Sequence, residues 1–510
     1  MQDSGQYGGQ QDIRTLGIVG AGIMGMGIAQ LAAQAGLSVR VLDAQPGAAQ
    51  RGHDRLAHTL TGLQSKGRLS DTRQRELLAA IQPVDTVSDL GGCDVVIEAI
   101  VEDLAAKRAL FAQLESVVAP NCILATNTSS LSVTGIAAGL SRPERVAGMH
   151  FFNPVPVMKL VEVVDGLLTD PSVGDALVGL GERLGHTAVR AQDTPGFIVN
   201  HAGRGYGTEA LRILAEGVAE FHDVDRVLRE TAGFIIGPFE LMDVTALDVS
   251  HPVMEAIYRQ YYEEPRYRPQ PLTRQMRDAG LVGRKAGRGF YRYVDGVRQG
   301  VDPAPPPGAT TPCTVWLAPD APAPLQRLVD ALGPRDAGAQ PQSGSLCVVA
   351  PLGVDATTAA LQWGLDATRT VAIESLFDLG RRRVLMTTPA TTPAWRAAAH
   401  AHFAGDGVPV TVVCDSAGLI AQRVVAMIVN IACDMAQQRI ATPVDIDRAV
   451  GLGLNYPCPP LAWGDRLGPR TILSILEGLQ ACSGDPRYRP SPWLRRRAAL
   501  GLSLLCDEAR

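Results

Sequence analysis

Short runs of apolar and β-branched residues alternate with longer amphipathic segments between Thr15 and about Val189. The runs predict strands at 16–19, 38–42, 94–99, 122–126, 146–150, 161–164 and 187–189. Between the first of them, residues 24–35 and 104–118 repeat apolar positions at helical spacing. Strands that alternate with helices in this way predict βαβ units and a mainly parallel α/β sheet.

The pattern changes beyond this region. Apolar residues recur at helical spacing over 194–281 while strand signals fade, which predicts a helical domain. Residues 293–312 are rich in proline, cannot join a packed strand ladder and predict a linker. A second, smaller α/β domain is expected beyond the linker, and no glycine-rich turn follows its first strand, so we expect no nucleotide there. Its strands are expected at 314–317, 346–349, 370–373, 383–387 and 410–413.

The last part of the chain repeats the helical region. Three segments recur at offsets of 222, 222 and 221 residues: TPGFIVN as SAGLIAQ, HDVDR as VDIDR, and EEPRYRP as GDPRYRP. This indicates an internal duplication, which supplies either a pseudo-dimer within one chain or part of a larger dimer interface. The expected domains are a disordered lead-in (1–12), a nucleotide-binding α/β domain (13–192), a helical domain (193–292), the linker (293–312), the smaller α/β domain (313–413) and a second helical domain (414–510).

Composition and charge narrow the class of protein. Apolar residues make up 46% and charged residues 19% of the 510, which excludes a disordered or fibrous protein. The net charge of −5 argues against bulk nucleic-acid binding, which needs a basic surface. Nine cysteines without a CxxC pair suggest neither a metal site nor disulfides, and therefore a reducing, cytoplasmic location. No apolar segment reaches the ~18–20 residues that cross a bilayer, and residues 1–12 lack the basic start of a secretory signal.

A glycine-rich turn, GAGIMG, follows the first expected strand and opens the first expected helix. Its first glycine makes the tight turn, its second lets the backbone approach a pyrophosphate, and its third lets helix and strand pack closely. The phosphates would lie at a helix N-terminus, which favours anions. Asp43 ends the next strand, and its carboxylate can bind both ribose hydroxyls, which favours NAD over NADP. The expected cofactor contacts here are Gly20, Gly22, Ile23, Met24, Gly25 and Asp43.

His150 lies at the carboxyl end of an expected strand, where open α/β sheets bind ligands. Twelve residues later, Glu162 lies among the apolar residues of the next strand, where a carboxylate is costly unless it is paired. A pair with His150 would remove that cost, fix the imidazole tautomer and make His150 a general base. The polar segment 127–132 and Asn200 supply further polar groups. The alternative, a core histidine and an edge-strand glutamate without a shared role, stays open at this point.

An ordered string of motifs over about 14–292 resembles the 3-hydroxyacyl-CoA dehydrogenase family. The motifs are GAGIMG, EAIVED, NTSSLS, HFFNPVPVMKLVE, DTPGFIVN, GPFELMD and KAGRGFY. The resemblance implies a Rossmann-type NAD domain, a helical domain, and NAD-dependent oxidation of a (3S)-3-hydroxyacyl-CoA. It implies that His150 takes the hydroxyl proton and Glu162 orients it, while Ser129 and Asn200 bind the substrate oxygen. The positions that match family contacts to NAD are Glu102, Lys107, Ser129, Asn153 and Lys285.

The duplicated helical region and the second α/β domain resemble the longer bacterial members of the family, which act in phenylacetate catabolism. That resemblance implies 3-hydroxyadipyl-CoA as the substrate, with 3-hydroxybutyryl-CoA or general fatty-acid β-oxidation as the alternative. The distal carboxylate of such a substrate needs a cation. Arg204, four residues beyond Asn200, is a candidate, although an exposed helix arginine is the simpler interpretation. The short members also imply a homo-oligomer, a dimer or higher, through the helical domains.

Two other hypotheses compete with this one. A β-hydroxyacid or sugar-acid dehydrogenase has the same glycine turn but uses a lysine in place of the His–Glu pair. A non-catalytic protein that kept the fold would have lost one or more of Ser129, His150, Glu162 and Asn200, and all four are present. The second helical copy has Gln422 in place of Asn200 and no second glycine turn, so we interpret it as structural. Its arginines Arg487, Arg489, Arg495, Arg496 and Arg497 are expected on a solvated face or an interface, with contact to CoA phosphates as the alternative.

Overall fold

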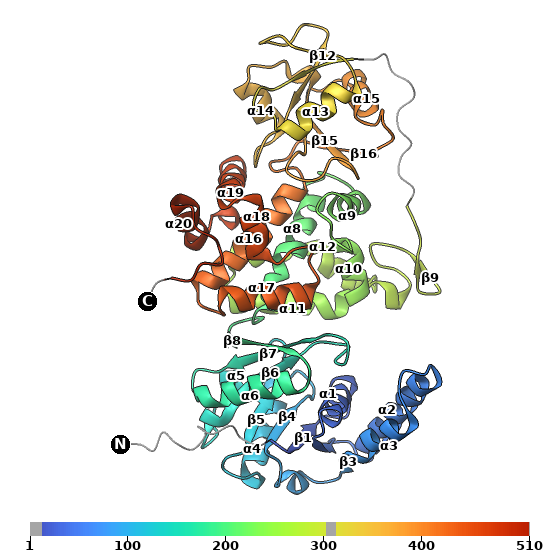
Figure 1. Cartoon of the computed structure of the whole chain (residues 1–510), viewed down its shortest axis with the longest axis vertical. Helices are drawn as coiled ribbons and strands as arrows, with labels where there is room; N and C mark the ends of the chain where they lie inside the picture. Colours follow the sequence, from blue (N-terminus) through green and yellow to red (C-terminus); the bar gives the residue numbers. More distant parts are fainter. Residues whose placement is uncertain (1–12, 302–312, 509–510) are drawn as a thin grey trace. The chain divides into compact units, whose positions relative to one another are not determined.

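Figure 1 shows the computed structural model of the chain, which describes residues 13–301 and 313–508. These residues form two compact units. The first contains the residues up to 201 together with 438–454, and the second contains 202–437 and the residues from 455 on. The expected lead-in and the part of the expected linker at 302–312 lie outside the described residues.

An eight-stranded sheet forms the centre of the first unit. Its strand order is β3-β2-β1-β4-β5-β6-β7-β8, and all neighbours pair in parallel except β6 and β7. The chain changes direction across the sheet between β1 and β4, and doubly wound sheets bind their ligands at such a switch point. The strands are β1 (Thr15–Val19), β2 (Ser38–Leu42), β3 (Ile81–Val84), β4 (Val95–Glu98), β5 (Ile123–Thr126), β6 (Val146–Phe151), β7 (Leu160–Asp165) and β8 (Thr187–Gln192).

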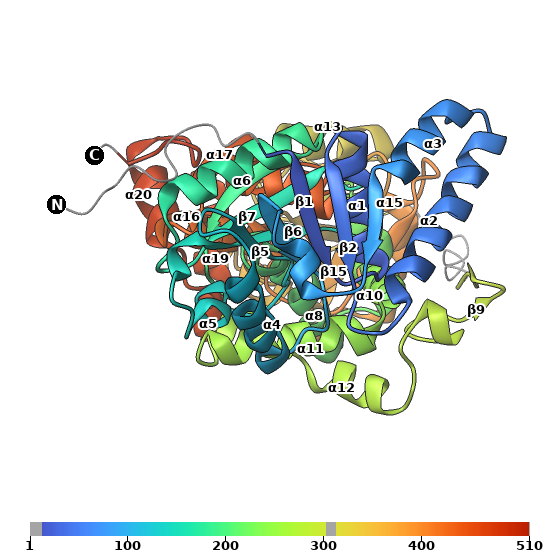
Figure 2. The same cartoon turned by 90° about the horizontal axis from the view of Figure 1, so that it is seen from below.

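Helices cover both faces of this sheet, as Figure 2 shows from below. They are α1 (Ile23–Gln34), α2 (Ala48–Ser65), α3 (Asp71–Ala79), α4 (Leu104–Val117), α5 (Val133–Ala137), α6 (Pro171–Arg183) and α7 (Val199–Ala202). Side chains of β4 alternate between two cores: Ile97 belongs to the core that includes α1 and α6, whereas Val96 belongs to the core that includes Phe111 of α4. The apolar runs on both faces explain why the strands were recognisable in the sequence.

One strand of this sheet was missed from the sequence. Strand β3 pairs only with β2 and forms the edge of the sheet. It contains Pro83, which cannot donate a ladder hydrogen bond and is therefore tolerated at an edge. Helices α2 and α3 lie side by side next to this edge (Figures 1 and 2).

Helix α17 (Pro443–Leu454) reaches the first sheet from far along the chain. It packs against β7 and β8, and the backbone N–H of Gln192 donates to the carbonyl of Ile440 at 2.8 Å. A Cβ at Gly453 would lie 2.8 Å from Cγ2 of Val199, so this close approach requires glycine. The expected second helical domain, 414–510, therefore contributes its residues 438–454 to the first unit.

The second unit contains most of the helices and a short hairpin. The helices are α8 (Arg204–Ala215), α9 (Phe221–Glu230), α10 (Pro238–Thr245), α11 (Leu247–Gln260), α12 (Pro271–Asp278), α16 (Ala421–Gln437), α18 (Pro460–Leu467), α19 (Pro469–Ser483) and α20 (Pro492–Leu500). The hairpin pairs β9 (Tyr293–Val294) with β10 (Val297–Arg298), within the segment that we expected to be a linker. Asp295 and Gly296 have φ values of 50° and 73°, and such a dipeptide favours a tight hairpin turn. The linker prediction was therefore wrong for these residues.

A second sheet occupies 313–413 of this unit. Its strand order is β12-β11-β13-β14-β15-β16, with β14 and β15 antiparallel. The strands are β11 (Thr314–Leu317), β12 (Arg335–Asp336), β13 (Ser345–Val349), β14 (Thr370–Ile373), β15 (Arg383–Thr387) and β16 (Val410–Val413). Helices α13 (Ala323–Leu332) and α15 (Pro393–Phe403) pack on one apolar core with these strands, and α14 (Ala356–Gln362) contacts β13 and β14.

The two segments that the sequence predicts to be helical copies pack against each other. Helix α16 is buried along nearly its whole length and contacts α8, its counterpart in the first copy. Arg423 of α16 contacts Glu209 of α8 at 2.5 Å, with both side chains buried. The two PRYRP segments also meet, and Arg489 donates to Glu264 at 2.7 Å. Contacts between like elements are typical of a two-fold, dimer-like interface.

Candidate active site

Glu162 and His150 form a buried pair on neighbouring strands. They lie directly opposite each other in the antiparallel pair β6–β7. Oε2 of Glu162 lies 2.6 Å from Nδ1 of His150, and the two residues are 0% and 5% exposed. The carboxylate in an apolar strand therefore has the partner that its burial requires.

The second carboxylate oxygen of Glu162 is held by the chain that enters α7. Backbone N–H groups of Ile198 and Val199 donate to Oε1 at 3.0 and 2.9 Å. These two donors fix the carboxylate, so its other oxygen accepts from Nδ1–H of His150 and leaves Nε2 as the proton-accepting nitrogen. The rings of Phe152 and Phe197 lie 4.4 and 5.8 Å from the imidazole, between centroids, and limit its rotation.

Ser129 and Asn200, the other two expected catalytic residues, contact each other. The side-chain amide of Asn200 donates to the carbonyl of Ser129 at 3.3 Å. Asn127, two residues before Ser129, accepts from the backbone N–H of Phe151 at 2.8 Å and joins the ends of β5 and β6. These contacts link Ser129 and Asn200 to His150 and Glu162. Phe151, which binds Asn127, is the next residue after His150. Val199, which binds Glu162, is the residue before Asn200.

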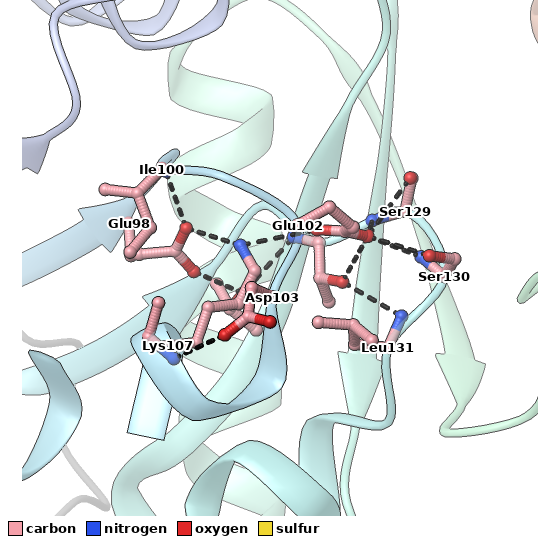
Figure 3. A network of polar contacts seen from close by, with 11 residues as sticks. Glu98, Ile100, Glu102, Asp103, Lys107, Ser129, Ser130 and Leu131 are labelled. Atoms are coloured by element: carbon pink, nitrogen blue, oxygen red, sulfur yellow. Dashed lines mark hydrogen bonds and ion pairs between the residues drawn. The ribbon is translucent and has the colours of Figure 1, made fainter. Parts of the chain in front are cut away.

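Glu102 is the centre of a hydrogen-bond network with the NTSS segment (Figure 3). Its Oε1 accepts from the hydroxyl of Thr128 at 2.7 Å, and from the backbone N–H groups of Ser129 and Ser130 at 2.9 and 3.0 Å. Burial alone would raise the pKa of Glu102, but the Lys107 ammonium and these donors together lower it. The carboxylate is thus ionised and fixes the backbone of Ser129.

Lys107 lies behind this network and not at its surface. It is 1% exposed, and its ammonium contacts Oε1 of Glu98 at 2.5 Å and Oε2 of Glu102 at 3.4 Å. Glu98 also accepts from the Thr126 hydroxyl at 2.7 Å. Glu98 opens the EAIVED motif, but no role was predicted for it from the sequence. Its place at the end of an apolar strand was the available signal, because a buried carboxylate there needs a partner.

The glycine turn has the geometry that a pyrophosphate needs. Gly20 has φ of 110°, and a Cβ there would lie 2.4 Å from the carbonyl oxygen of Ala99. A Cβ at Gly25 would lie 1.8 Å from the carbonyl oxygen of Gly20, so helix and turn pack without space for a side chain. A Cβ at Gly22 would meet nothing within 4 Å, which leaves its backbone open to a ligand.

Asp43 and this turn line the same cavity, which has a volume of about 680 Å³. Its Oδ2 accepts from the backbone N–H of Ala21 at 2.8 Å, which holds the carboxylate at the end of β2. The cavity also contains Ile100 and Val101 after β4 and the apolar face of α4. A nucleotide fits this set of residues: donors at a helix N-terminus, an acceptor for ribose hydroxyls, and apolar walls.

The remaining expected NAD contacts lie in different places. Ile23 and Asn153 line a second cavity of about 410 Å³ on the other side of Gly22, and Met24 packs against the core. Lys285 belongs to the second unit, where it is exposed and contacts Asp248 at 2.5 Å. Direct contacts of these residues with NAD, like those of the glycine turn, Asp43, Glu102, Lys107 and Ser129, stay predictions.

Over 13–301 and 313–508, no group of three or more His, Cys, Asp and Glu is arranged to hold a metal ion. Among the same residues, no helix combines the length and the apolar character that a membrane span requires.

A glycine turn, a carboxylate at the end of the next strand and a buried His–Glu pair on one mainly parallel sheet are the features expected of a nicotinamide-dependent dehydrogenase. The family model described as "3-hydroxyacyl-CoA dehydrogenase, NAD binding domain" matches residues 15–194. The model described as "3-hydroxyacyl-CoA dehydrogenase, C-terminal domain" matches 196–293 and 418–503. The chain therefore belongs to the 3-hydroxyacyl-CoA dehydrogenase family, a family of NAD-dependent oxidoreductases.

Relatives of two lengths resemble the chain. A 3-hydroxyadipyl-CoA dehydrogenase of Escherichia coli K12 is 37% identical over 491 residues, which cover 96% of this chain and 98% of that protein. A probable 3-hydroxybutyryl-CoA dehydrogenase of Bacillus subtilis is 42% identical but covers 56% of this chain and 99% of its own length. A crystal structure of an E. coli K12 3-hydroxybutyryl-CoA dehydrogenase has a TM-score of 0.83 and 36% identity, over 96% of this chain and 99% of that one.

Proposed function

We propose that this protein oxidises 3-hydroxyadipyl-CoA to 3-oxoadipyl-CoA with NAD as the hydride acceptor. The observation that carries the chemistry is the buried His150–Glu162 pair, on the same sheet as a nucleotide cavity. Support for the substrate comes from the full-length relative of that name, because the short relatives named after 3-hydroxybutyryl-CoA cover only about half of this chain. The full-length structure named after 3-hydroxybutyryl-CoA makes that compound the second candidate.

In the proposed mechanism, Nε2 of His150 accepts the proton of the substrate 3-hydroxyl. Glu162 stabilises the imidazolium that forms, and its backbone donors keep it from rotating away. The Ser129 hydroxyl and the Asn200 amide are the donors for negative charge that develops on the oxygen. The glycine turn and Asp43 would hold NAD, which would supply the acceptor for the hydride from C3.

The Ser129 hydroxyl donates to Glu102 at 3.2 Å, which is a long hydrogen bond. Because four other donors already hold the same carboxylate oxygen, this hydroxyl can turn toward a substrate without leaving Glu102 unpaired. The network thus positions Ser129 through its backbone and leaves its side chain available.

We also infer that the second helical copy is structural and arose by duplication. Gln422, at the position of Asn200, is 0% exposed and bound on both ends of its amide. It accepts from Gly353 N–H at 3.0 Å and donates to Glu374 at 3.0 Å and to the Pro351 carbonyl at 3.1 Å. Both N–H groups of this amide are used inside the fold, so it has no donor left for a substrate oxygen. We further propose that the protein is a homo-oligomer through its helical domains, that it is located in the cytoplasm and that it acts in phenylacetate catabolism.

Formation of NADH from 3-hydroxyadipyl-CoA or 3-hydroxybutyryl-CoA by the full-length protein tests the proposed activity. We expect turnover with NAD, weak turnover with NADP, and a loss of about 10²–10⁴-fold in kcat for His150→Gln. His400→Gln, in α15 of the second unit, is the matched control and is expected to keep wild-type turnover. No turnover of either substrate by the wild-type protein would overturn the proposal.

A further inference from the structure

Asp193 connects two parts of the active site within the first unit. It follows β8, at the start of the turn that leads into α7. Its Oδ1 accepts from the backbone N–H of Val133 at 3.0 Å, and its Oδ2 accepts from the backbone N–H of Thr134 at 2.7 Å. The Ser132 hydroxyl also donates to Oδ2, at 2.7 Å. The carboxylate thus binds two N–H groups at the start of α5 that have no partner within the helix.

The segment between β5 and α5, which contains Ser129, is therefore bound from two sides. Glu102 accepts from the backbone N–H groups of Ser129 and Ser130 at 2.9 and 3.0 Å (Figure 3). Asp193 binds the same segment at Ser132, three residues beyond Ser129. The position of Ser129 thus depends on two carboxylates, one that follows β4 and one that follows β8.

The turn that begins at Asp193 has a strained backbone. Phe197 has φ of 47°, which is rare for a residue with a bulky side chain. Such a conformation persists only where the surrounding structure holds it in place. The Phe197 ring is buried in one of the two cores of the sheet, and Asp193 holds the other end of the turn. The next two residues, Ile198 and Val199, supply the N–H groups that fix Glu162.

We propose that Asp193 is a positioning residue that holds Ser129 and Glu162 in the arrangement that the reaction requires. It acts on Ser129 through the start of α5 and on Glu162 through the strained turn. The hydrogen bond from the Asn200 amide to the Ser129 carbonyl joins the two parts at 3.3 Å. A displacement of about 1 Å at a reacting group can cost about 10²-fold in rate, so a residue that acts through others can limit catalysis. This inference rests on the proposed function, which gives Ser129 and Glu162 their roles.

The second unit contains a matching set of contacts. Strands β13, β14, β15 and β16 are neighbours in the same order as β5, β6, β7 and β8, and the middle pair is antiparallel in both sheets. Asp415, 222 residues beyond Asp193, accepts from the backbone N–H groups of Ala356 and Thr357 at the start of α14, at 2.7 and 3.2 Å. Leu419, in the turn after it, has φ of 48°. The same carboxylate contacts and the same strained turn therefore occur in both sheets.

The catalytic residues are not repeated with them. Strands β14 and β15 pair in the register of β6 and β7, which puts Glu374 and Val384 at the positions of His150 and Glu162. Valine offers no carboxylate to orient a base. Asp415 is therefore an internal control, because it has the local contacts of Asp193 without a His–Glu pair beside it.

Asp193→Asn and Asp415→Asn in the full-length protein test the inference. An amide cannot accept from every donor that the carboxylate binds, so each variant loosens one set of contacts. We would measure both melting temperatures and then, well below them, kcat with 3-hydroxyadipyl-CoA and NAD. Asp193→Asn is expected to lower kcat about 10- to 100-fold, because Ser129 and Glu162 lose their positions. Asp415→Asn is expected to lower the melting temperature to a similar extent and to leave kcat at the wild-type value.

Two further measurements keep the test decisive if Asp193→Asn does not fold. Ser132→Ala removes one donor to Asp193 and should lower kcat about 3- to 10-fold, whereas Ser132→Thr keeps the hydroxyl and should restore kcat. Ser132→Ala combined with Ser129→Ala should lose less than the product of the two single losses, because the first variant acts through the second residue.

The outcomes separate this inference from the proposed function. Wild-type kcat in Asp193→Asn and Ser132→Ala, an equal loss of kcat in Asp415→Asn, or fully multiplicative losses in the double variant would overturn the positioning role while leaving the dehydrogenase activity in place. No NADH from 3-hydroxyadipyl-CoA or 3-hydroxybutyryl-CoA with the wild-type protein would instead overturn the proposed function.

Discussion

Glu162 faces His150 across the antiparallel strand pair β6–β7, and the backbone donors of Ile198 and Val199 hold its second oxygen. The orientation of His150, the proposed general base, is therefore set by the segment that leads into α7. Because Gly453 of α17 packs on Val199, the second helical copy supports the same segment. This gives the distant copy a structural connection to the catalytic pair.

Replacing Glu162 by Gln should lower kcat strongly while changing KM little. The amide still offers an oxygen to the Ile198 and Val199 donors, so the fold around it is kept, but it carries no charge to stabilise the imidazolium. We expect a loss of about 10²-fold or more in kcat, because the interaction strengthens only as the proton moves. Steady-state kinetics with 3-hydroxyadipyl-CoA check this, and a rise in KM at unchanged kcat would contradict it.

Gly22 and Gly25 should respond in opposite ways to the same added methyl group. A Cβ at Gly22 meets open space, so Gly22→Ala should leave the melting temperature unchanged and weaken NADH binding, because the methyl group occupies the path of the pyrophosphate. A Cβ at Gly25 meets the Gly20 carbonyl at 1.8 Å, so Gly25→Ala should destabilise the protein by several kcal/mol, on the order of other severe core clashes. Thermal melting and NADH fluorescence titration separate the two effects. Equal losses of stability in both variants would contradict this interpretation.

Local chemistry explains what was predictable from the sequence. The glycine turn and Asp43 could be predicted because both lie within one βαβ unit, where the nucleotide and the backbone determine which residues are needed. The His150–Glu162 pair follows from two adjacent strands and the cost of an unpaired carboxylate. Most strands of the first sheet were found because their apolar runs are buried on both faces, whereas the edge strands β3 and β12 of the two sheets were missed.

Contacts between distant segments explain what was missed. The packing of α17 on β7 and β8 depends on the Gln192–Ile440 hydrogen bond, between residues that no local pattern connects. Lys107 was expected to contact NAD, whereas its burial against Glu98 depends on the way α4 folds back on β4. The β9–β10 hairpin did have a local signal, the Asp295–Gly296 dipeptide, which the neighbouring prolines outweighed.

Lys107→Met should destabilise the first unit, because it leaves the carboxylate of Glu98 buried without its cation. Removing one partner of a buried ion pair typically costs about 3–5 kcal/mol, and we expect a loss in this range. The double variant Lys107→Met with Glu98→Gln should recover more than half of it, since the amide that replaces the carboxylate carries no charge. Urea unfolding measures the free energy of each variant, with Lys66→Met on the surface as control. Additive losses in the double variant would contradict the pairing.

Asp225 should make the stability of the protein depend on pH. Burial raises the pKa of Asp225 to about 6, although the N–H groups of Phe239 and Glu240 and the hydroxyl of Tyr291 donate to it. The folded protein therefore binds a proton that the unfolded chain, with a pKa near 3.8, has lost. The free energy of unfolding contributed by this group should be fully present below pH 3.8 and should decline as the pH rises to about 6.

Asp225→Asn tests this dependence, because an amide does not titrate in the same window. Urea unfolding between pH 4 and 7 should show a steeper decline of stability with rising pH for the wild type than for Asp225→Asn. The comparison uses the slope and not the absolute stability, since the amide cannot accept from all three donors at once. Asp223→Asn, on the same helix α9 but partly exposed, is the matched control and should keep the wild-type slope. Equal slopes in wild type and Asp225→Asn would show that this carboxyl group is ionised throughout, and that the hydrogen bonds from α10 and Tyr291 outweigh its burial.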